Sequence, residues 1–301
     1  MHILILGNAS DDDSAYLKDK LERAGAIVEY WDSQTFPRHL QLTWYPHTYG
    51  GYLKLPTGKT IHLNDIHSVF WSTLLPVDVP LLPDSHQYRI AVTDSISILR
   101  SLIRGCSARW VNSWEAHQFH QEKPLQLSAV KELGVAIPKT LISNNPEHIR
   151  AFASTVPQLI FKPVYGGAPT RLLKFSRLER ERLNQVFRLS PVTLQEYVPG
   201  TNIRCYVIGQ QVYAAEIRSS YLDFREDKQA RFIPAILPKS IHIACLKIAQ
   251  ALFLEWTAID WRLSPQGEFI FLNADPSPMF THFEHVTGFP LTEKLVQLLI
   301  H

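Results

Sequence analysis

Hydrophobic positions at the start of the chain fall into short apolar runs separated by an amphipathic stretch. Residues 2–7 are typical of a buried strand, and residues 15–24 fit a helix that Gly25 would end. A second apolar run at residues 26–31 completes a strand–helix–strand order, which predicts a parallel sheet. The GxGxxG pattern is absent, so the sequence gives no support for dinucleotide binding.

Several short apolar runs between residues 40 and 75 predict a β-rich insertion. Within it, Gly58-Lys59-Thr60 resembles the end of a phosphate-binding loop. That pattern also needs a glycine five residues before Gly58, where this chain has Leu53. We therefore interpret residues 56–60 as a hairpin turn.

Helical and strand patterns then alternate to the end of the chain. Further strands are predicted at residues 66–71, 110–113, 158–163, 171–175 and 192–198. Further helices are predicted at residues 87–104, 114–133, 177–188, 240–253 and 292–299. The pattern as a whole predicts an α/β protein.

A predicted hairpin at residues 258–275 has apolar strands and a polar end. In the register that its turn suggests, Asp260 lies opposite Phe271, and Asn273 and Asp275 share its face because side chains alternate along a strand. A buried carboxylate needs a partner, and Mg²⁺ is bound by such oxygen atoms. The alternative is an ordinary polar strand end in solvent.

Composition limits the classes of partner. The chain has 301 residues, enough for two or three subdomains, and its 30 basic and 28 acidic residues leave a net charge of +2. This balance indicates no nucleic-acid partner. No apolar run is long enough for a membrane span, and the start does not resemble a signal peptide. The three widely spaced cysteines form no disulfide framework, which favours a cytoplasmic protein. They are Cys106, Cys205 and Cys245.

Two other polar features are interpreted as structural. The acidic run Asp11-Asp12-Asp13 precedes a predicted helix and would cap it. The pairs His117/His120 and His282/His285 have spacing compatible with metal binding, but no third ligand is near them in sequence. We expect solvated or capping roles for these histidines.

A series of short motifs in the second half of the chain carries the chemistry. None is specific alone, but their order is. They are Asn112-Ser113, Lys123, residues 134–140, Phe161-Lys162-Pro163, Gly166-Gly167, residues 194–200, Asn202-Ile203-Arg204, Glu216-Ile217-Arg218 and the acidic hairpin. In this order they resemble the ATP-grasp superfamily of carboxylate ligases. The similarity is strongest to ribosomal-protein glutamate ligases and microviridin-type (graspetide) peptide ligases.

The resemblance runs from about Asn112 to the end of the chain and is weaker before it. It implies the α+β ATP-grasp fold, in which an N-terminal parallel-sheet βαβ domain precedes two α+β subdomains with ATP between them. The implied domains are residues 1–112, residues 113–198 with the central helix and small subdomain, and residues 199–301 with the metal site.

The resemblance also gives each candidate residue a role in ATP chemistry. The phosphate-binding residues would be Lys123, Lys162, Gly166 and Gly167. The adenine hinge would be Gln195, Glu196, Tyr197 and Val198. The residues facing the γ-phosphate and the acyl-phosphate would be Arg204 and Arg218. The ligands of one or two Mg²⁺ ions would be Asp260, Asn273 and Asp275.

This sequence departs from the family pattern at two places near the site. The family hairpin usually ends in Glu-x-Asn, with the glutamate between two cations, whereas this chain has Asn273-Ala274-Asp275. An acidic residue two positions before the motif arginine is replaced by Asn202. A third departure concerns the substrate, because residues 70–75 lack the two arginines that microviridin-type ligases often carry.

The resulting hypothesis is an ATP- and Mg²⁺-dependent ligase. A substrate carboxylate would attack the γ-phosphate, and an amine or alcohol would then displace phosphate from the acyl-phosphate. A peptide is the substrate that the resemblance implies, and a small amino acid or metabolite carboxylate is the alternative. A nucleotide- or peptide-binding module that has lost catalysis is a further alternative, which the Asn273/Asp275 exchange supports. Taken singly, Lys162 could also be a solvated strand end, and Arg204 and Arg218 could be surface ion pairs. A homodimer is left open.

Overall fold

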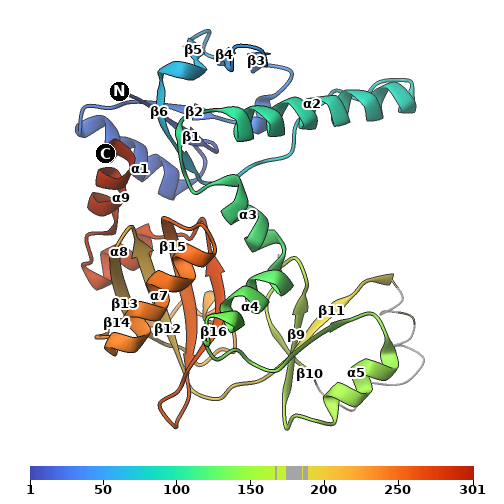
Figure 1. Ribbon diagram of the computed structural model, residues 1–301, viewed down its shortest axis with the longest axis vertical. Coiled ribbons are helices and arrows are strands. Elements are labelled where there is room, and N and C mark those ends of the chain that lie inside the picture. The colour runs from blue at the N-terminus through green and yellow to red at the C-terminus, as the bar shows by residue number, and fades with distance from the viewer. Residues whose placement is uncertain (167, 174–184, 186–188) are drawn as a thin grey trace. The chain divides into compact units, whose positions relative to one another are not determined.

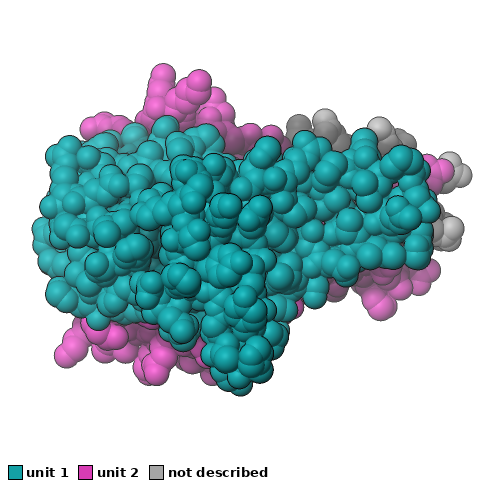
Figure 2. Space-filling view, turned by 90° about the horizontal axis from the view of Figure 1, so that it is seen from above, with its two compact units in different colours: residues 1–114, 277–301 teal, residues 115–276 magenta. Residues whose placement is uncertain are grey.

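The computed structural model describes residues 1–166, 168–173, 185 and 189–301 (Figure 1). The chain divides into two compact units, which Figure 2 colours separately. Unit 1 contains residues 1–114 and 277–301, and unit 2 contains residues 115–276. The helix predicted near residues 177–188 lies outside the described residues, apart from residue 185.

Unit 1 is built on a parallel sheet with the strand order β2-β1-β6-β7. Its strands are β1 (His2–Leu6), β2 (Ile27–Trp31), β6 (Ile66–Trp71) and β7 (Arg109–Val111). The helices α1 (Asp12–Arg23) and α2 (Ser85–Gly105) follow β1 and β6 in the chain. The central strand β1 is an apolar run because residues on both of its faces are buried. The parallel sheet that the sequence predicted is confirmed.

The insertion between β2 and β6 is a three-stranded antiparallel sheet. Its strands are β3 (Gln41–Tyr45), β4 (Gly50–Lys54) and β5 (Thr60–His62). In the connection between β4 and β5, the Leu55 amide donates to the Lys59 carbonyl at 2.8 Å. Gly58 has φ of +85°, which favours glycine. The interpretation of this Gly-Lys-Thr as a hairpin turn is therefore confirmed.

The chain returns to unit 1 with α8 (Thr281–Thr287) and α9 (Leu291–Ile300). The Asp13 carboxylate accepts hydrogen bonds from the amides of Phe280 and Thr281, at 3.0 and 3.1 Å. Ser68 donates to the carbonyl of Leu299 at 2.7 Å, at the other end of this segment. Residues 277–301 thus fold with the N-terminal sheet, whereas the sequence assigned them to the C-terminal subdomain. The expected capping of α1 by the acidic run is wrong for Asp13, whose side chain caps α8.

Unit 2 contains two antiparallel sheets (Figure 1). The four-stranded sheet has the order β10-β9-β11-β8, with β8 (Thr140–Ser143), β9 (Leu159–Pro163), β10 (Arg171–Leu173) and β11 (Val192–Glu196). The five-stranded sheet has the order β14-β13-β12-β15-β16, with β12 (Thr201–Ile208), β13 (Gln211–Arg218), β14 (Arg231–Pro234), β15 (Trp256–Leu263) and β16 (Phe269–Asp275). Unit 2 also contains the helices α5 (Pro146–Ala153) and α7 (Lys239–Ala251).

The single helix predicted at residues 114–133 is two helices, α3 (Trp114–Gln121) and α4 (Lys123–Glu132). Between them, Glu122 has non-helical backbone angles, with φ of −98° and ψ of 56°. Pro124 lies in the first turn of α4, where its missing N–H costs no hydrogen bond. The break puts Lys123 at the start of a helix.

The β15–β16 hairpin has a different register from the predicted one. Asp260 pairs with Asn273 and not with Phe271, which lies opposite Trp261. The offset of two residues has two sources. Leu263 next to the turn pairs with Phe269, where the predicted register puts Glu268, and a β-bulge then leaves one extra residue on β16. Asp275 lies two residues beyond Asn273 and therefore on the same face. The three oxygen-bearing side chains still share one face.

Candidate active site

A half-buried ion pair joins the neighbouring strands β12 and β15 of the five-stranded sheet. Arg204 on β12 lies directly opposite Asp260 on β15. Its Nε and Nη2 atoms donate to Oδ1 and Oδ2 of Asp260 at 2.8 and 2.9 Å. Burial acts to lower the pKa of Arg204, but the Asp260 carboxylate outweighs it and the pKa is raised. Arg204 is therefore charged at any physiological pH.

Lys123 reaches the acidic hairpin from the start of α4. Its Nζ atom donates to Oδ1 of Asn273 at 3.0 Å. The helix is held on β16 by Gln126, whose side chain donates to the Ala274 carbonyl at 2.9 Å and accepts from its amide at 3.0 Å. Burial lowers the pKa of Lys123, and the Asp275 carboxylate opposes this shift. Residues far apart in sequence thus place an ammonium group beside the hairpin.

Lys162 on β9 carries the second ammonium group, and its side chain is half-buried. Its Nζ atom donates to Oε1 of Gln195 at 3.2 Å, and Gln195 donates to the Thr140 hydroxyl at 2.9 Å. Burial lowers the pKa of Lys162 to about 8, and the positive charges of Lys123 and Arg225 add to the shift. Lys162 and Lys123 therefore act on each other electrostatically, although they come from different elements.

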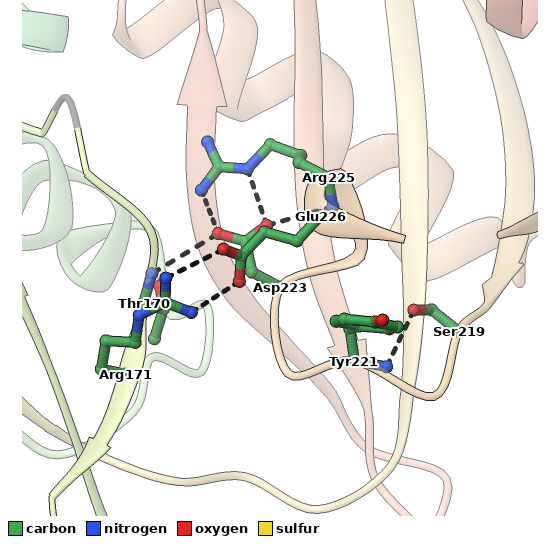
Figure 3. A network of polar contacts seen from close by, with 7 residues as sticks. All are labelled: Thr170, Arg171, Ser219, Tyr221, Asp223, Arg225 and Glu226. Carbon is green, nitrogen blue, oxygen red and sulfur yellow. Dashed lines mark hydrogen bonds and ion pairs between the residues drawn. The ribbon is translucent and has the colours of Figure 1, made fainter. Parts of the chain in front are cut away.

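Arg225 joins this group of cations, and the sequence analysis missed it. Asp223, which is buried, accepts from Nε and Nη2 of Arg225 at 2.8 and 2.5 Å (Figure 3). The positive charge of Arg225 lowers the pKa of both Lys123 and Lys162. Only the spacing Asp223-Phe224-Arg225 marks this residue in the sequence, and such acid–base pairs are common on surfaces.

The loop that carries Arg225 is tied to β10 and the residue before it (Figure 3). Arg171 forms two hydrogen bonds with Glu226, at 2.7 and 2.9 Å. The Thr170 amide donates to the Asp223 carboxylate at 3.5 Å. Figure 3 shows these residues converging from two separate strand connections. They hold Arg225 in place from the side of the four-stranded sheet.

Arg218 lies apart from this cluster. It ends β13, its side chain is 63% exposed, and its Nε atom donates to Glu216 at 2.7 Å. Within the described residues no interaction links it to the lysines or to Asp260. This geometry matches the surface ion pair that the sequence left as the alternative.

The predicted adenine hinge, residues 195–198, begins with the last two residues of β11 and continues beyond the strand. The amides of Glu196 and Tyr197 donate to the carbonyls of Lys139 and Gln158, at 2.9 and 2.8 Å. The Gln195 side chain is buried and accepts from Lys162, as described above. The hinge therefore begins beside one of the two ammonium groups.

The glycine loop passes close to Lys123. Gly166 has φ of +109°, and a side-chain carbon added there would lie 3.2 Å from Cε of Lys123. A larger residue would press on the ammonium-bearing chain. Gly167, the other predicted loop residue, lies outside the described residues.

The donor set at the hairpin fits a hard cation. Asp260, Asn273 and Asp275 supply only oxygen atoms on one face, which is the ligand chemistry of Mg²⁺. Asp260 already accepts from Arg204, and Asn273 accepts from Lys123. The cluster thus combines two carboxylates with bound cationic side chains.

The histidine pairs add no metal site. His117 is buried, so the expected solvated role is wrong for it, and burial lowers its pKa to about 3, with His120 contributing. No set of three or more histidine, cysteine, aspartate or glutamate side chains suited to a metal occurs among residues that the structure describes. In the same part of the chain, every helix is too short or too polar to cross a bilayer.

Comparison with known proteins gives one family match. The model of the RimK-like ATP-grasp domain matches residues 120–299. The chain is 27% identical over 189 residues to a probable alpha-L-glutamate ligase of Citrobacter koseri. It is 26% identical over 189 residues to the ribosomal protein bS6–L-glutamate ligase of Escherichia coli O81. Each match covers 59% of this chain and 62% of the relative's length.

Solved structures match the whole chain. The ATP-grasp ligase PsnB, complexed with its minimal precursor, matches with a TM-score of 0.86 and 25% sequence identity. The match covers 99% of this chain and 98% of the PsnB chain. The macrocyclase MdnC of Microcystis aeruginosa, bound with precursor peptide MdnA, has a TM-score of 0.87 at 23% identity over all of both chains. The α+β ATP-grasp fold expected from the sequence is confirmed.

Proposed function

The chain belongs to the RimK-like ATP-grasp family, and we propose that it is an ATP-dependent ligase that joins a carboxylate to an amine or an alcohol. One observation carries this proposal. The two half-buried lysines, Lys123 and Lys162, donate to the neutral amide oxygens of Asn273 and Gln195, and among the residues that the structure describes neither donates to a carboxylate. Charges of the same sign that are partly removed from water need an anion, and a polyphosphate supplies it.

In this proposal the cationic side chains have different roles in binding the nucleotide and in phosphoryl transfer. Lys123 and Lys162 neutralise phosphate oxygens, and Gly166 lets the loop backbone approach them. Arg204 and Arg225 stabilise the negative charge that develops during phosphoryl transfer. Bound Mg²⁺, held by Asp260, Asn273 and Asp275, would add neutralisation of phosphate charge. One or two ions are compatible with this donor set.

The proposed reaction has two steps. An oxygen of the substrate carboxylate attacks the γ-phosphorus, and ADP leaves. An amine or alcohol then attacks the carbonyl carbon of the acyl-phosphate, and phosphate leaves with that carboxylate oxygen. The chain contributes position and positive charge, and no side chain forms a covalent intermediate.

A peptide is the substrate that we propose. Its support is that PsnB and MdnC, whose structures match nearly the whole chain, are described with precursor peptides. The glutamate ligases support a second candidate, the addition of an amino acid to a carboxylate. Asn273 is a neutral residue in the proposed metal-binding position. It supports a third candidate, a module that binds nucleotide or peptide without catalysing a reaction.

The test is ADP release from Mg²⁺–ATP with three sets of additions. These are short peptides with acidic residues plus lysine, serine or threonine, single amino acids, and buffer alone. We expect ADP release only when a peptide is present. For each ADP released, one bond should form, and the mass of the peptide should fall by one water. Release with single amino acids alone would favour the second candidate. ATP binding without ADP release under any condition would favour the binding module.

A further inference from the structure

We infer that Arg262 is a positioning residue for the adenine hinge. The inference rests on the proposed ATP binding, and it adds a residue that holds the hinge without touching phosphate. Arg262 lies on β15, where it pairs with Asn202 of β12. Residues 197–200 connect β11 to β12 and pass beside it.

Three hydrogen bonds run from this one guanidinium to the connection. Nε donates to the Val198 carbonyl at 2.9 Å, and Nη2 donates to the Tyr197 hydroxyl at 3.2 Å. Nη1 donates to Oδ1 of Asn202 at 2.7 Å. The guanidinium carbon also lies 5.7 Å from the centre of the Tyr197 ring. Arg262 therefore binds the connection near its start, in its middle and just beyond its end.

The backbone beyond Val198 is fixed on the same strand. Gly200 has φ of +135°, and a side-chain carbon added there would lie 2.0 Å from the Leu263 carbonyl oxygen. Only glycine fits so close to β15. Gly200 and the three bonds of Arg262 together leave Val198 little freedom.

The hydrogen bonds of the hinge backbone explain why this matters for a purine. The amides of Glu196 and Tyr197 donate to Lys139 and Gln158, as described above, and the Val198 carbonyl accepts from Arg262. Across residues 1–166, 168–173 and 189–301, the Val198 amide has no hydrogen-bond acceptor. An N–H group held in a fixed direction is what a ring nitrogen of adenine needs.

Every acceptor of Arg262 is neutral. Asn202 supplies an amide oxygen where the family pattern has an acid, and in the described part of the chain no carboxylate pairs with Arg262. The geometry, and not an ion pair, therefore sets its position. An aspartate at residue 202 would strengthen the bond.

The experiment compares two ligands by calorimetric titration with Mg²⁺, ATP and inorganic tripolyphosphate. Tripolyphosphate reports the phosphate site alone, because it has no base. For Arg262→Met we expect ATP affinity to fall about tenfold, while tripolyphosphate affinity stays within about twofold of the parent. Asn202→Asp should keep or raise ATP affinity. Lys162→Ala should weaken both ligands, and the matched surface variant Arg23→Met should change neither.

Each outcome separates this inference from the proposed function. A parent that binds neither ligand overturns the proposed function. A parent that binds ATP, together with an Arg262→Met variant that binds it equally well, overturns only the role of Arg262. If Arg262→Met loses both ligands, Asn202→Leu removes a single hydrogen bond instead. A selective loss of ATP in that variant supports the inference, and a loss of both ligands overturns it.

Discussion

At the scale of the residue, Lys162 donates to the amide oxygen of Gln195, and burial lowers its pKa to about 8. Bound phosphate would favour the protonated form and raise this pKa. ATP binding should therefore take up a proton as the pH approaches and passes 8.

We predict that ATP affinity falls as the pH rises above about 8. The affinity falls and does not rise because the neutral amine, which dominates above the pKa of Lys162, cannot attract phosphate. In Lys162→Arg the guanidinium stays charged, so the dependence on pH should disappear. Calorimetry in two buffers with different ionisation enthalpies measures the proton uptake. Equal uptake in the parent and in Lys162→Arg would remove Lys162 from the phosphate site.

Arg225 and Arg218 are exposed to nearly the same extent, 64% and 63%, and they differ in the groups that they influence. We predict that Arg225→Met lowers ligation turnover about a hundredfold, because it removes charge beside both lysines. Arg218→Met should lower it less than about threefold, since its partner is the surface residue Glu216. Turnover should fall more than ATP affinity in the first variant. The opposite order would support the role near the acyl-phosphate that the family resemblance implies for Arg218.

At the scale of the element, the β15–β16 hairpin collects the oxygen ligands. Its predicted register was wrong by two residues at Asp260, because nothing in the local pattern marks the length of the turn or the bulge. Asp260, Asn273 and Asp275 still share one face, since side chains alternate along a strand and an offset of two residues keeps the same face. The site is thus less sensitive to register than the pairing is.

We predict that Asp275→Asn raises the Mg²⁺ concentration needed for half-maximal ATP binding by at least about tenfold. It leaves one carboxylate, Asp260, and that group also accepts from Arg204. The double change Asn273→Glu with Asp275→Asn restores two carboxylates and should return the requirement to near the parent value. Magnesium titrations of all three proteins test this, and superimposable curves would rule out Asp275 as a ligand.

Helix boundaries show what sequence pattern can and cannot predict. The strands of unit 1 and α1 were predicted because their apolar periods are local. The break at Glu122 was missed although Pro124 marks it, because the apolar positions continue through both helices. Lys123 and Lys162 were found through the order of motifs. Arg225 was missed because only the folded loop brings it to the lysines.

At the scale of the whole molecule, the chain starts in unit 1, builds unit 2 and ends in unit 1. The end of the chain is held there by side chains of earlier elements. Asp13 caps α8, and Ser68 and Arg109 donate to the carbonyls of Leu299 and Leu298 at 2.7 Å. These long-range bonds could not be predicted from sequence, because each joins residues separated by at least 189 positions.

We predict that Asp13→Ala lowers the free energy of unfolding by about 1–2 kcal/mol, the usual cost of losing a helix cap. Its carboxylate accepts from two backbone amides at the start of α8, which would be left without it. Asp12→Ala is the matched control, because Asp12 is exposed on the same turn of α1. Urea unfolding measures both variants. Equal loss in the two would show that the acidic run acts as a whole and not through this cap.

The central claim, ligation through an acyl-phosphate, is tested most directly by following oxygen. A peptide substrate is prepared with heavy oxygen in its carboxylates and is incubated with the protein, Mg²⁺ and ATP. Mass spectrometry of the released phosphate should find one heavy oxygen per ADP formed, while the peptide loses one labelled oxygen per bond. Phosphate without the label, or release of AMP and pyrophosphate, would contradict the account.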